Sequence, residues 1–420
     1  MDIPDWRLRF TSLLGMVLLL ALAWGLSNNR RRVPWRTVSW GLGLQFAFAV
    51  FILKTPVGAG LFDFANRAVL RLNDFANEGA KLVFGPLGDP ALLAQRFGAG
   101  NAFIFAVTIS ASVIVVSALS SLFYHWRILP WVVQAMAWVM RRCMGTSGSE
   151  TLAAATNIFL GQTESALVIK AYLEGMTRSE VMALMTIGMS TIASGVMVVY
   201  ALMGASSGHL LTASVMSAPA ALLIAKVMFP ETQASQTAAG APVRLERTFT
   251  NSIDALCRGA GEGVTLAINI LGMLIAFVAV VALANHSIAW LLRKLFALHL
   301  ETPLQAVLGW ANTPFAWLMG IPARDCPLVG RILGERIVLN EFFGYLTLTQ
   351  QKAMLNARSF TLATYALCGF ANFGSIAVQI GGIGALAPGR RNDLAQLGLR
   401  SMIGGLLACY LTATIAGLLI

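Results

Sequence analysis

The sequence predicts an all-α protein that crosses a membrane about eight times. Of its 420 residues, 57% are hydrophobic and 12% are charged, whereas soluble domains carry roughly 25% charged residues. Apolar windows also recur along the whole chain, and most are close to the roughly 20 residues that cross a bilayer as helix. Basic residues gather between these windows. A polytopic helical membrane protein is the class that fits.

The expected spans follow from these windows in chain order. The N-terminal window has acids before its apolar run and lacks a clean small-residue cleavage site, so we expect a retained span and not a signal peptide. The windows are Phe10–Leu26, Val38–Leu53, Ala102–Phe123, Val181–Met203, Leu210–Phe229, Val264–Ala284, Phe360–Leu386 and Leu397–Ile420.

The net charge of +11 lies mainly in loops. Arg30–Arg36 separates the first two windows, and further basic clusters follow the third and fifth windows and precede the last. Cationic loops mark the cytoplasmic side of a membrane, which puts the N-terminus outside despite Arg7 and Arg9. No basic–aromatic pattern points to nucleic acid. The charge therefore indicates topology, with membrane lipid as the partner.

Three segments are too polar for ordinary spans. Arg127–Arg142 and Phe62–Phe84 have apolar residues at helical spacing with charges interspersed, so we expect interfacial amphipathic helices. Pro230–Arg244, "PETQASQTAAGAPVR", is rich in Pro, Ala, Thr and Gln and predicts a linker that divides the protein.

Two apolar segments are interrupted by polar residues near the middle. Gly148–Ala171 contains "GQTE" between two arms of about ten residues, and Pro327–Leu348 contains "VLNEFFGY". At 1.5 Å per residue, each arm spans only about half a bilayer. We expect both to be re-entrant helical hairpins, because a membrane accepts broken backbone only where protein buries it or where it lines a cavity.

Each hairpin is followed by a span with a polar, glycine-containing middle and then by a plainer span. The broken spans are Met189–Tyr200, "MSTIASGVMVVY", and Cys368–Gln379, "CGFANFGSIAVQ". This order, twice over with one crossing between the copies, is typical of an inverted repeat with its site at the repeat interface. The expected units are 1–126 (scaffold spans and interfacial helix), 127–229 (first transport repeat), 230–300 (linker and scaffold span) and 301–420 (second transport repeat).

Two carboxylates stand out within these segments. Glu164 and Glu341 fall at membrane depth, where an ionisable group costs about 2.5–3.5 kcal/mol on insertion scales, so both are functional candidates. The alternative is an ion pair with an arginine from another element, for which Arg324, Arg331 and Arg336 are available.

Neutral polar residues leave more room for a structural explanation. Asn157 and Thr191 could simply bond across helices, as small polar residues do in membranes. Asn372 and Ser375 lie among glycines that let a helix unwind and expose carbonyls, which together with side-chain oxygens suit a monovalent cation.

Other chemistries have weak support. The five cysteines have no CxxC spacing, and the four histidines form no HxxxH pair, so we expect neither a metal centre nor a disulfide framework. There is no P-loop and no Gly-Xaa-Ser-Xaa-Gly motif. We therefore expect neither an enzyme nor an ATP-driven pump.

Four motifs in order, "NIFLGQTE", "MSTIASGV", "VLNEFFGY" and "CGFANFGSIAVQIGGIGALAP", resemble the concentrative nucleoside transporters in their eight-span bacterial form. "LMGIP" (Leu318–Pro322) is also similar to the family, and the similarity runs from about Leu82 to the C-terminus. The resemblance implies a homotrimer. In each protomer, a scaffold of the first three spans and the sixth would support a mobile domain containing both hairpins.

The resemblance also implies site residues. The first hairpin and its broken span would read the nucleobase, the second pair would hold the ribose, and a coupling sodium ion would lie between the first hairpin tip and the next span. The nucleobase set is Gln162, Thr163, Glu164 and Val196; the ribose set is Glu341, Phe370, Asn372 and Ser375; the sodium set is the side chains of Asn157 and Thr191 with the carbonyls of Leu160, Thr191 and Ile192.

The implied function is sodium-driven import of nucleosides such as uridine across a bacterial inner membrane. Asn157 favours sodium, because family members that use protons often lack the matching asparagine. Two positions depart from the family's usual motif: Gly374 replaces a common serine, and "ESAL" follows the Gln-Thr pair where Glu-Ala-Pro is frequent. These departures affect the fine selectivity. The alternatives are proton coupling, a dicarboxylate or amino-acid carrier, and a membrane enzyme acting on lipid-linked nucleotides. The last two would need basic residues or a metal at the site.

Overall fold

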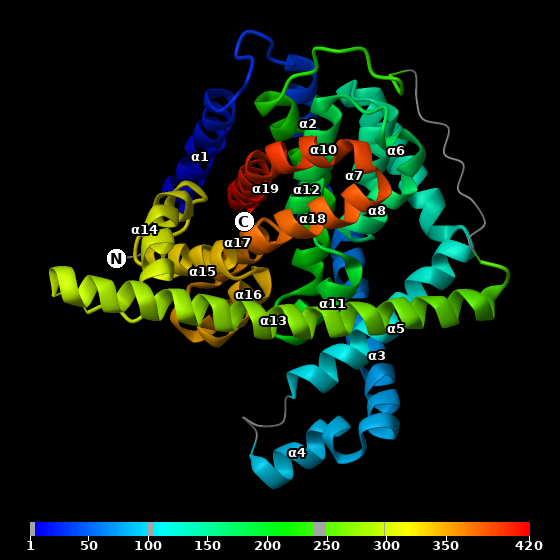
Figure 1. Cartoon of the computed structure of the whole chain (residues 1–420), viewed down its shortest axis with the longest axis vertical. Coiled ribbons are helices and arrows are strands. Elements are labelled where there is room, and N and C mark those ends of the chain that lie inside the picture. Colours follow the sequence, from blue (N-terminus) through cyan, green and yellow to red (C-terminus); the bar gives the residue numbers. More distant parts are fainter. Residues whose placement is uncertain (1–4, 99–103, 239–248, 298) are drawn as a thin grey trace.

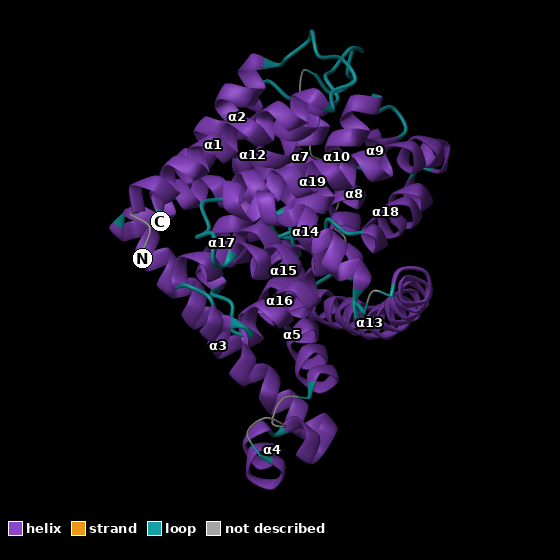
Figure 2. Cartoon of the chain, turned by 90° about the vertical axis from the view of Figure 1, so that its left-hand side faces the viewer, coloured by secondary structure: helices purple, strands orange, loops and turns teal. Residues whose placement is uncertain are grey.

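The structure is a computed structural model that describes residues 5–98, 104–238, 249–297 and 299–420. These residues form helices, turns and loops, with no strand among them (Figures 1 and 2). Seven helical stretches within the described ranges are long and apolar enough to cross a membrane. The all-α membrane class predicted from composition is confirmed.

Long helices occupy most of the predicted windows. The helix α5 covers the third window from Phe105 onward, and the start of that window at Ala102 lies outside the described residues. The helices and their bounds are α1 (Asp5–Gly25), α2 (Trp35–Lys54), α3 (Pro56–Phe84), α4 (Pro90–Phe97), α5 (Phe105–His125), α6 (Ile128–Met144), α12 (Ser207–Met228), α13 (Ser252–Phe296), α14 (Pro303–Leu318) and α19 (Arg391–Leu419).

The helix α13 is much longer than its predicted window of Val264–Ala284. It runs for 45 residues, about 68 Å at 1.5 Å per residue, and lies at one edge of the molecule, where Figure 2 views it nearly end-on. The Asn251 side chain caps it by accepting from Asp254 N at 2.9 Å, and Ala297 ends it with a left-handed φ of 54°. The window missed residues 252–263, which are helical but polar, and it stopped before the polar residues Asn285, His286 and Ser287, beyond which the helix is again apolar.

The two broken spans are confirmed as interrupted helices. The first consists of α10 (Arg178–Ser190) and α11 (Ser194–Leu202), and the second of α17 (Ala357–Leu367) and α18 (Phe373–Leu386). The seventh window, Phe360–Leu386, is therefore two helices, because the backbone leaves helical geometry from Cys368 to Asn372.

Each predicted hairpin is a pair of short helices separated by a non-helical break. Hairpin 1 is α7 (Gly148–Asn157) with α8 (Gln162–Val168), continued by α9 (Lys170–Leu173). Hairpin 2 is α15 (Cys326–Val338) with α16 (Glu341–Gln350). Their re-entry into the membrane stays a prediction.

The helices pack into two groups. In Figure 1 most of the larger group lies above α13, whereas α3 and α5 cross α13 in the view. The larger group surrounds α10, α12 and α19, and it includes both hairpins together with α1 and α2, which contact α19 and α12. The smaller group is α3, α5 and α13. In it, a Cβ on Gly259 or Gly263 would come within 2.7 Å of α5 atoms, so glycine permits the close α5–α13 approach.

The amphipathic segments are helices, as expected. They correspond to α6 and to α3, which extends the predicted Phe62–Phe84 back to Pro56. Their interfacial position and the division into four units stay predictions. The linker is irregular up to residue 238, and its remainder to Arg244 lies outside the described residues.

Candidate functional site

Glu341 is the buried centre of the second half of the site. It is the first residue of α16 and is 6% exposed. Its Oε1 accepts from Tyr200 Oη at 2.8 Å, and its Oε2 accepts from Asn372 Nδ2 at 3.0 Å. Both carboxylate oxygens are thus engaged by uncharged donors from two different broken spans.

The helix α18 carries a row of polar residues toward the hairpins. Asn372 caps the helix by accepting from Ser375 N at 2.9 Å, and Ser375 and Gln379 follow at positions three and seven residues further on. This spacing places the three side chains on one face of the helix. All three are buried, so the face lies within the protein.

Hairpin 1 meets the same face of α18. Gln162, the first residue of α8, accepts at Oε1 from Gln379 Nε2 at 2.9 Å. A Cβ on Gly382 would come within 2.4 Å of Thr163 Cγ2, so the helix and the hairpin tip are in close contact. One face of α18 therefore joins the two halves of the predicted site.

The remaining predicted residues differ in their exposure. Val196 is buried at 8% exposure and Phe370 is half-buried. Glu164 is exposed, and it accepts from the hydroxyl of Thr163 at 3.1 Å. The two carboxylates are thus unlike in this conformation, because Glu341 is enclosed whereas Glu164 faces outward at the hairpin tip.

The arginine alternative for Glu341 is not realised among the described residues. Each arginine considered for it bonds to another group, so Glu341 keeps its neutral donors. The pairs are Arg324 Nε with Asp325 Oδ1 at 3.3 Å, Arg331 Nε with Glu335 Oε1 at 3.2 Å, and Arg336 Nη1 with the carbonyl oxygen of Ala366.

The predicted cation ligands meet where hairpin 1 touches the first broken span. Asn157 ends α7 and is 1% exposed. Its Nδ2 donates to Ile187 O at 2.9 Å and to Thr191 Oγ1, while its Oδ1 is buried without a hydrogen bond in the described part of the chain. A buried amide oxygen without a partner, on a side chain that also contacts a hydroxyl, suits a monovalent cation that binds oxygen.

The two backbone breaks lie side by side at this point. Ser194 donates from Oγ to Phe159 O at 2.7 Å and from its backbone N to the same oxygen at 3.3 Å. Leu160 and Ile192, whose carbonyls complete the predicted sodium set, belong to these breaks. The two segments are therefore fastened together beside Asn157.

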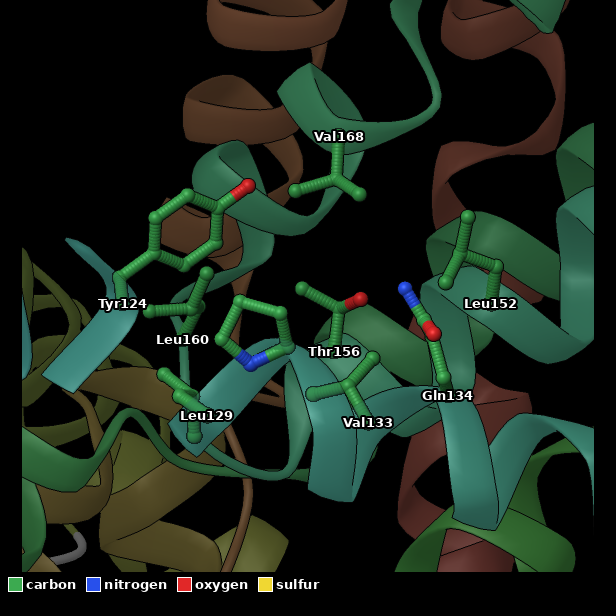
Figure 3. A pocket seen from close by; sticks show the side chains of 9 residues that line it. Tyr124, Leu129, Val133, Gln134, Leu152, Thr156, Leu160 and Val168 are labelled. Atoms are coloured by element: carbon green, nitrogen blue, oxygen red, sulfur yellow. The ribbon is translucent and has the colours of Figure 1, made fainter. Parts of the chain in front are cut away.

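Cavities adjoin both hairpins. One of about 10 Å³ lies behind hairpin 1, where Thr156 and Leu160 face Leu129 and Val133 of α6 (Figure 3). It has room for about one water molecule. Another, of about 460 Å³, lies between α13 and hairpin 2 and has Leu339 and Phe343 in its wall. This volume is in the range of small-molecule pockets.

A buried charged network fastens the base of hairpin 1. Lys226 on α12 pairs with Glu150 of α7 and with Glu231 at 3.3 Å, and donates to Ser179 Oγ at 2.9 Å. Nearby, Glu180 accepts from Ser235 Oγ at 2.5 Å. The visible part of the linker is thus tied to the first turns of α7 and α10.

The sequence predictions did not include Tyr200, Gln379 or Lys226. Tyr200 and Gln379 are the last residues of the two broken-span motifs, and Gln379 follows Asn372 at helical spacing. That periodicity could have identified Gln379. Lys226 had no local signal, because its partners come from three separate segments.

Paired broken helices that bring buried carboxylate and amide groups together define a membrane transporter. Comparisons with known proteins give the family. Models of the Na+ dependent nucleoside transporter N-terminus and C-terminus match residues 14–87 and 209–417, and a nucleoside recognition (gate) model matches residues 106–207.

Relatives match along the whole chain. The Uncharacterized transporter YutK of Bacillus subtilis is 39% identical over 97% of this chain and 98% of its own. Nucleoside permease NupC of Helicobacter pylori is 36% identical over 97% of each. The structure of CNTnw in an inward-facing substrate-bound state is 35% identical, with a TM-score of 0.90 over 98% of this chain and 97% of that one. The chain belongs to the concentrative nucleoside transporter family, which confirms the predicted resemblance, and it is a transporter and not an enzyme.

Proposed function

We propose that the protein is a sodium-driven nucleoside symporter of a bacterial inner membrane. The observation that carries this proposal is the position of Asn157, whose Nδ2 donates to Thr191 and whose Oδ1 is buried without a hydrogen bond among the described residues, where two helix breaks are fastened together. The family models describe Na+ dependent transporters. The sodium ion would be co-transported with the nucleoside, and its binding would order the same helix breaks that carry the nucleobase residues.

The nucleoside would lie between hairpin tips and broken spans. Ribose hydroxyls donate to carboxylates, which suits the enclosed Glu341 with Asn372 and Ser375, and Phe370 would lie against the sugar. Gln162, Thr163, Glu164 and Val196 would read the nucleobase. A deoxy sugar would leave a buried acceptor unpaired and bind less well.

Alternating access would occur by an elevator motion within a homotrimer. The packing supports this, because the hairpins, broken spans, α12 and α19 pack on one another, α3 and α13 both pack on α5, and the two groups meet at α11 and α12. The resemblance assigns α1 and α2 to the scaffold, although here they pack on α12 and α19. The cavity beside α13 and hairpin 2 is space into which the mobile body could move.

Uptake by purified protein in proteoliposomes tests the proposal. At fixed pH, we expect uridine accumulation to follow an imposed sodium gradient. We expect Glu341→Gln to abolish uptake without unfolding the protein, whereas Arg331→Gln, which changes an exposed partner of Glu335, retains it. Uptake that follows only a proton gradient would refute sodium coupling, and normal uptake by Glu341→Gln would refute the ribose assignment.

A further inference from the structure

In each hairpin, the first residue of the second helix is held by a residue of the opposite repeat. Tyr200, in the first repeat, donates to Glu341 of hairpin 2 at 2.8 Å. Gln379, in the second repeat, donates to Gln162 of hairpin 1 at 2.9 Å. The two bonds cross between the repeats.

The four residues occupy matching positions. Gln162 and Glu341 are each the first residue of the second hairpin helix, α8 and α16. Tyr200 is the seventh residue of α11, which begins at Ser194, and Gln379 is the seventh of α18, which begins at Phe373. The crossed bonds are therefore a feature of the repeat itself.

The bond from Gln379 fixes the polarity of Gln162. Gln379 Nε2 also donates to the carbonyl of Met185 at 3.0 Å, and a carbonyl can only accept. The amino end of Gln379 must therefore face both partners, so Gln162 turns its oxygen toward it. Gln162 is left with its NH2 group free to point elsewhere, which makes it a hydrogen-bond donor to a ligand.

The bond from Tyr200 orients Glu341, which presents acceptors to a ligand where Gln162 presents a donor. A phenol donates to a carboxylate, and the ring of Tyr200 is held by stacking on Tyr345 with centroids 4.2 Å apart. Tyr200 and Asn372 each use one acceptor position on a different oxygen of Glu341. Because a carboxylate has about four such positions, Glu341 keeps acceptor capacity for hydroxyl donors of a ligand.

We propose that Tyr200 and Gln379 are equivalent positioning residues that set the polarity of the site, so that hairpin 1 presents an amide donor and hairpin 2 presents a pair of acceptors. This rests on the proposed function and specifies its ligand class. The ligand has an acceptor on its base and two neighbouring hydroxyls on its sugar. Neither positioning residue needs to touch that ligand.

The test compares KM and kcat for uridine and 2′,3′-dideoxyuridine in proteoliposomes at saturating sodium. We expect Tyr200→Phe to raise the KM for uridine about tenfold and to reduce the preference for uridine over the dideoxy analogue by a similar factor. We expect Gln379→Met to raise the KM for both ligands equally, and to add less than about twofold in a Gln162→Ala background. Gln162→Glu can still accept from Gln379 but offers no amide donor, so it should raise the KM for both ligands about tenfold.

Matched controls come from buried residues outside the site. Tyr410→Phe removes a hydroxyl that donates to Asn312 at 2.6 Å, and Gln45→Met removes an amide that donates to Gly41 O at 3.0 Å. Neither should change the ratio between the two ligands.

Two results would overturn the proposal. One is an equal effect of Tyr200→Phe on the KM of both ligands. The other is a double variant of Gln379→Met and Gln162→Ala whose KM increase equals the product of the two single increases. Wild-type protein without saturable nucleoside uptake would instead overturn the proposed function. In that case thermal unfolding still tests the crossed bonds, because the Gln162 and Gln379 variants must again be non-additive.

Discussion

Lys226 and Glu150 form an ion pair inside the protein, with side chains 7% and 1% exposed. The pair joins the end of α12 to the first turn of hairpin 1. Removing one partner of a buried pair typically costs about 3–5 kcal/mol, because the other charge is left uncompensated.

We therefore expect Glu150→Gln or Lys226→Met to lower the thermal midpoint of the purified protein strongly. The double variant should be less destabilised than the sum of the two single changes. Arg258→Gln, which disrupts an exposed pair with Asp254, serves as the control and should have little effect. Additive effects of the Glu150 and Lys226 changes would show that the pair is not a unit.

Asn157→Leu should remove sodium dependence. The substitution keeps a similar volume but deletes the orphaned Oδ1 and the bonds to Ile187 and Thr191. The thermal shift caused by sodium chloride relative to choline chloride measures the effect. We expect a clear shift in the wild type and none in the variant, and Gln45→Leu should behave like the wild type. A sodium shift that persists in Asn157→Leu would contradict the assignment.

Asp325 gives stability a pH dependence. It lies between α14 and α15, outside the seven candidate spans, and it is 3% exposed. Burial by itself raises the pKa of this carboxyl, but donors from Ser359 at 2.6 Å and Asn356 N at 3.1 Å, with Arg324 beside it, hold the pKa below its ordinary value.

Because the folded pKa is the lower one, Asp325 stabilises the protein above its unfolded pKa of about 3.9. That contribution is lost as pH falls through the folded value. We expect Asp325→Asn to be less stable than the wild type at pH 7, and the gap between their thermal midpoints to narrow below about pH 4. A gap that is constant from pH 7 to pH 3 would count against this role.

Gly382 and Gly381 offer a matched pair on α18. A Cβ at Gly382 would meet Thr163 Cγ2 at 2.4 Å, whereas a Cβ at Gly381 has no neighbour within 4 Å. Gly382→Ala should displace Thr163 and raise the KM for uridine several-fold, about 1 kcal/mol of binding energy. Gly381→Ala should not. Equal KM values for the two variants would show that Thr163 does not need its present position.

The hairpins and broken spans were predictable because a polar residue within an apolar segment needs a hydrogen-bond partner inside the protein. Asn157 and Thr191 were grouped as cation ligands, and they are in hydrogen-bond contact. Glu341 and Asn372 were grouped as sugar ligands, and they are hydrogen-bonded to each other. These contacts follow from the need to satisfy polar groups away from water.

Other features depend on tertiary packing that no local pattern encodes. The length of α13 was underestimated, because polar residues flank the predicted window on both sides although the helix continues through them. Membrane depth was expected for both Glu164 and Glu341, but only the latter is enclosed here, since exposure at a hairpin tip depends on where neighbouring elements stand. Tyr200 acquires its role only through a partner 141 positions away in the sequence.

The crossed bonds bear on how such a molecule could have arisen. A single repeat with its own hairpin and broken span would lack the donor that orients its hairpin residue, since Gln162 and Glu341 each depend on the other half. An ancestral half-length chain would have needed a second copy to complete either binding surface. In the present chain Tyr200 is a phenol and Gln379 is an amide, so the two surfaces suit chemically different ends of one solute.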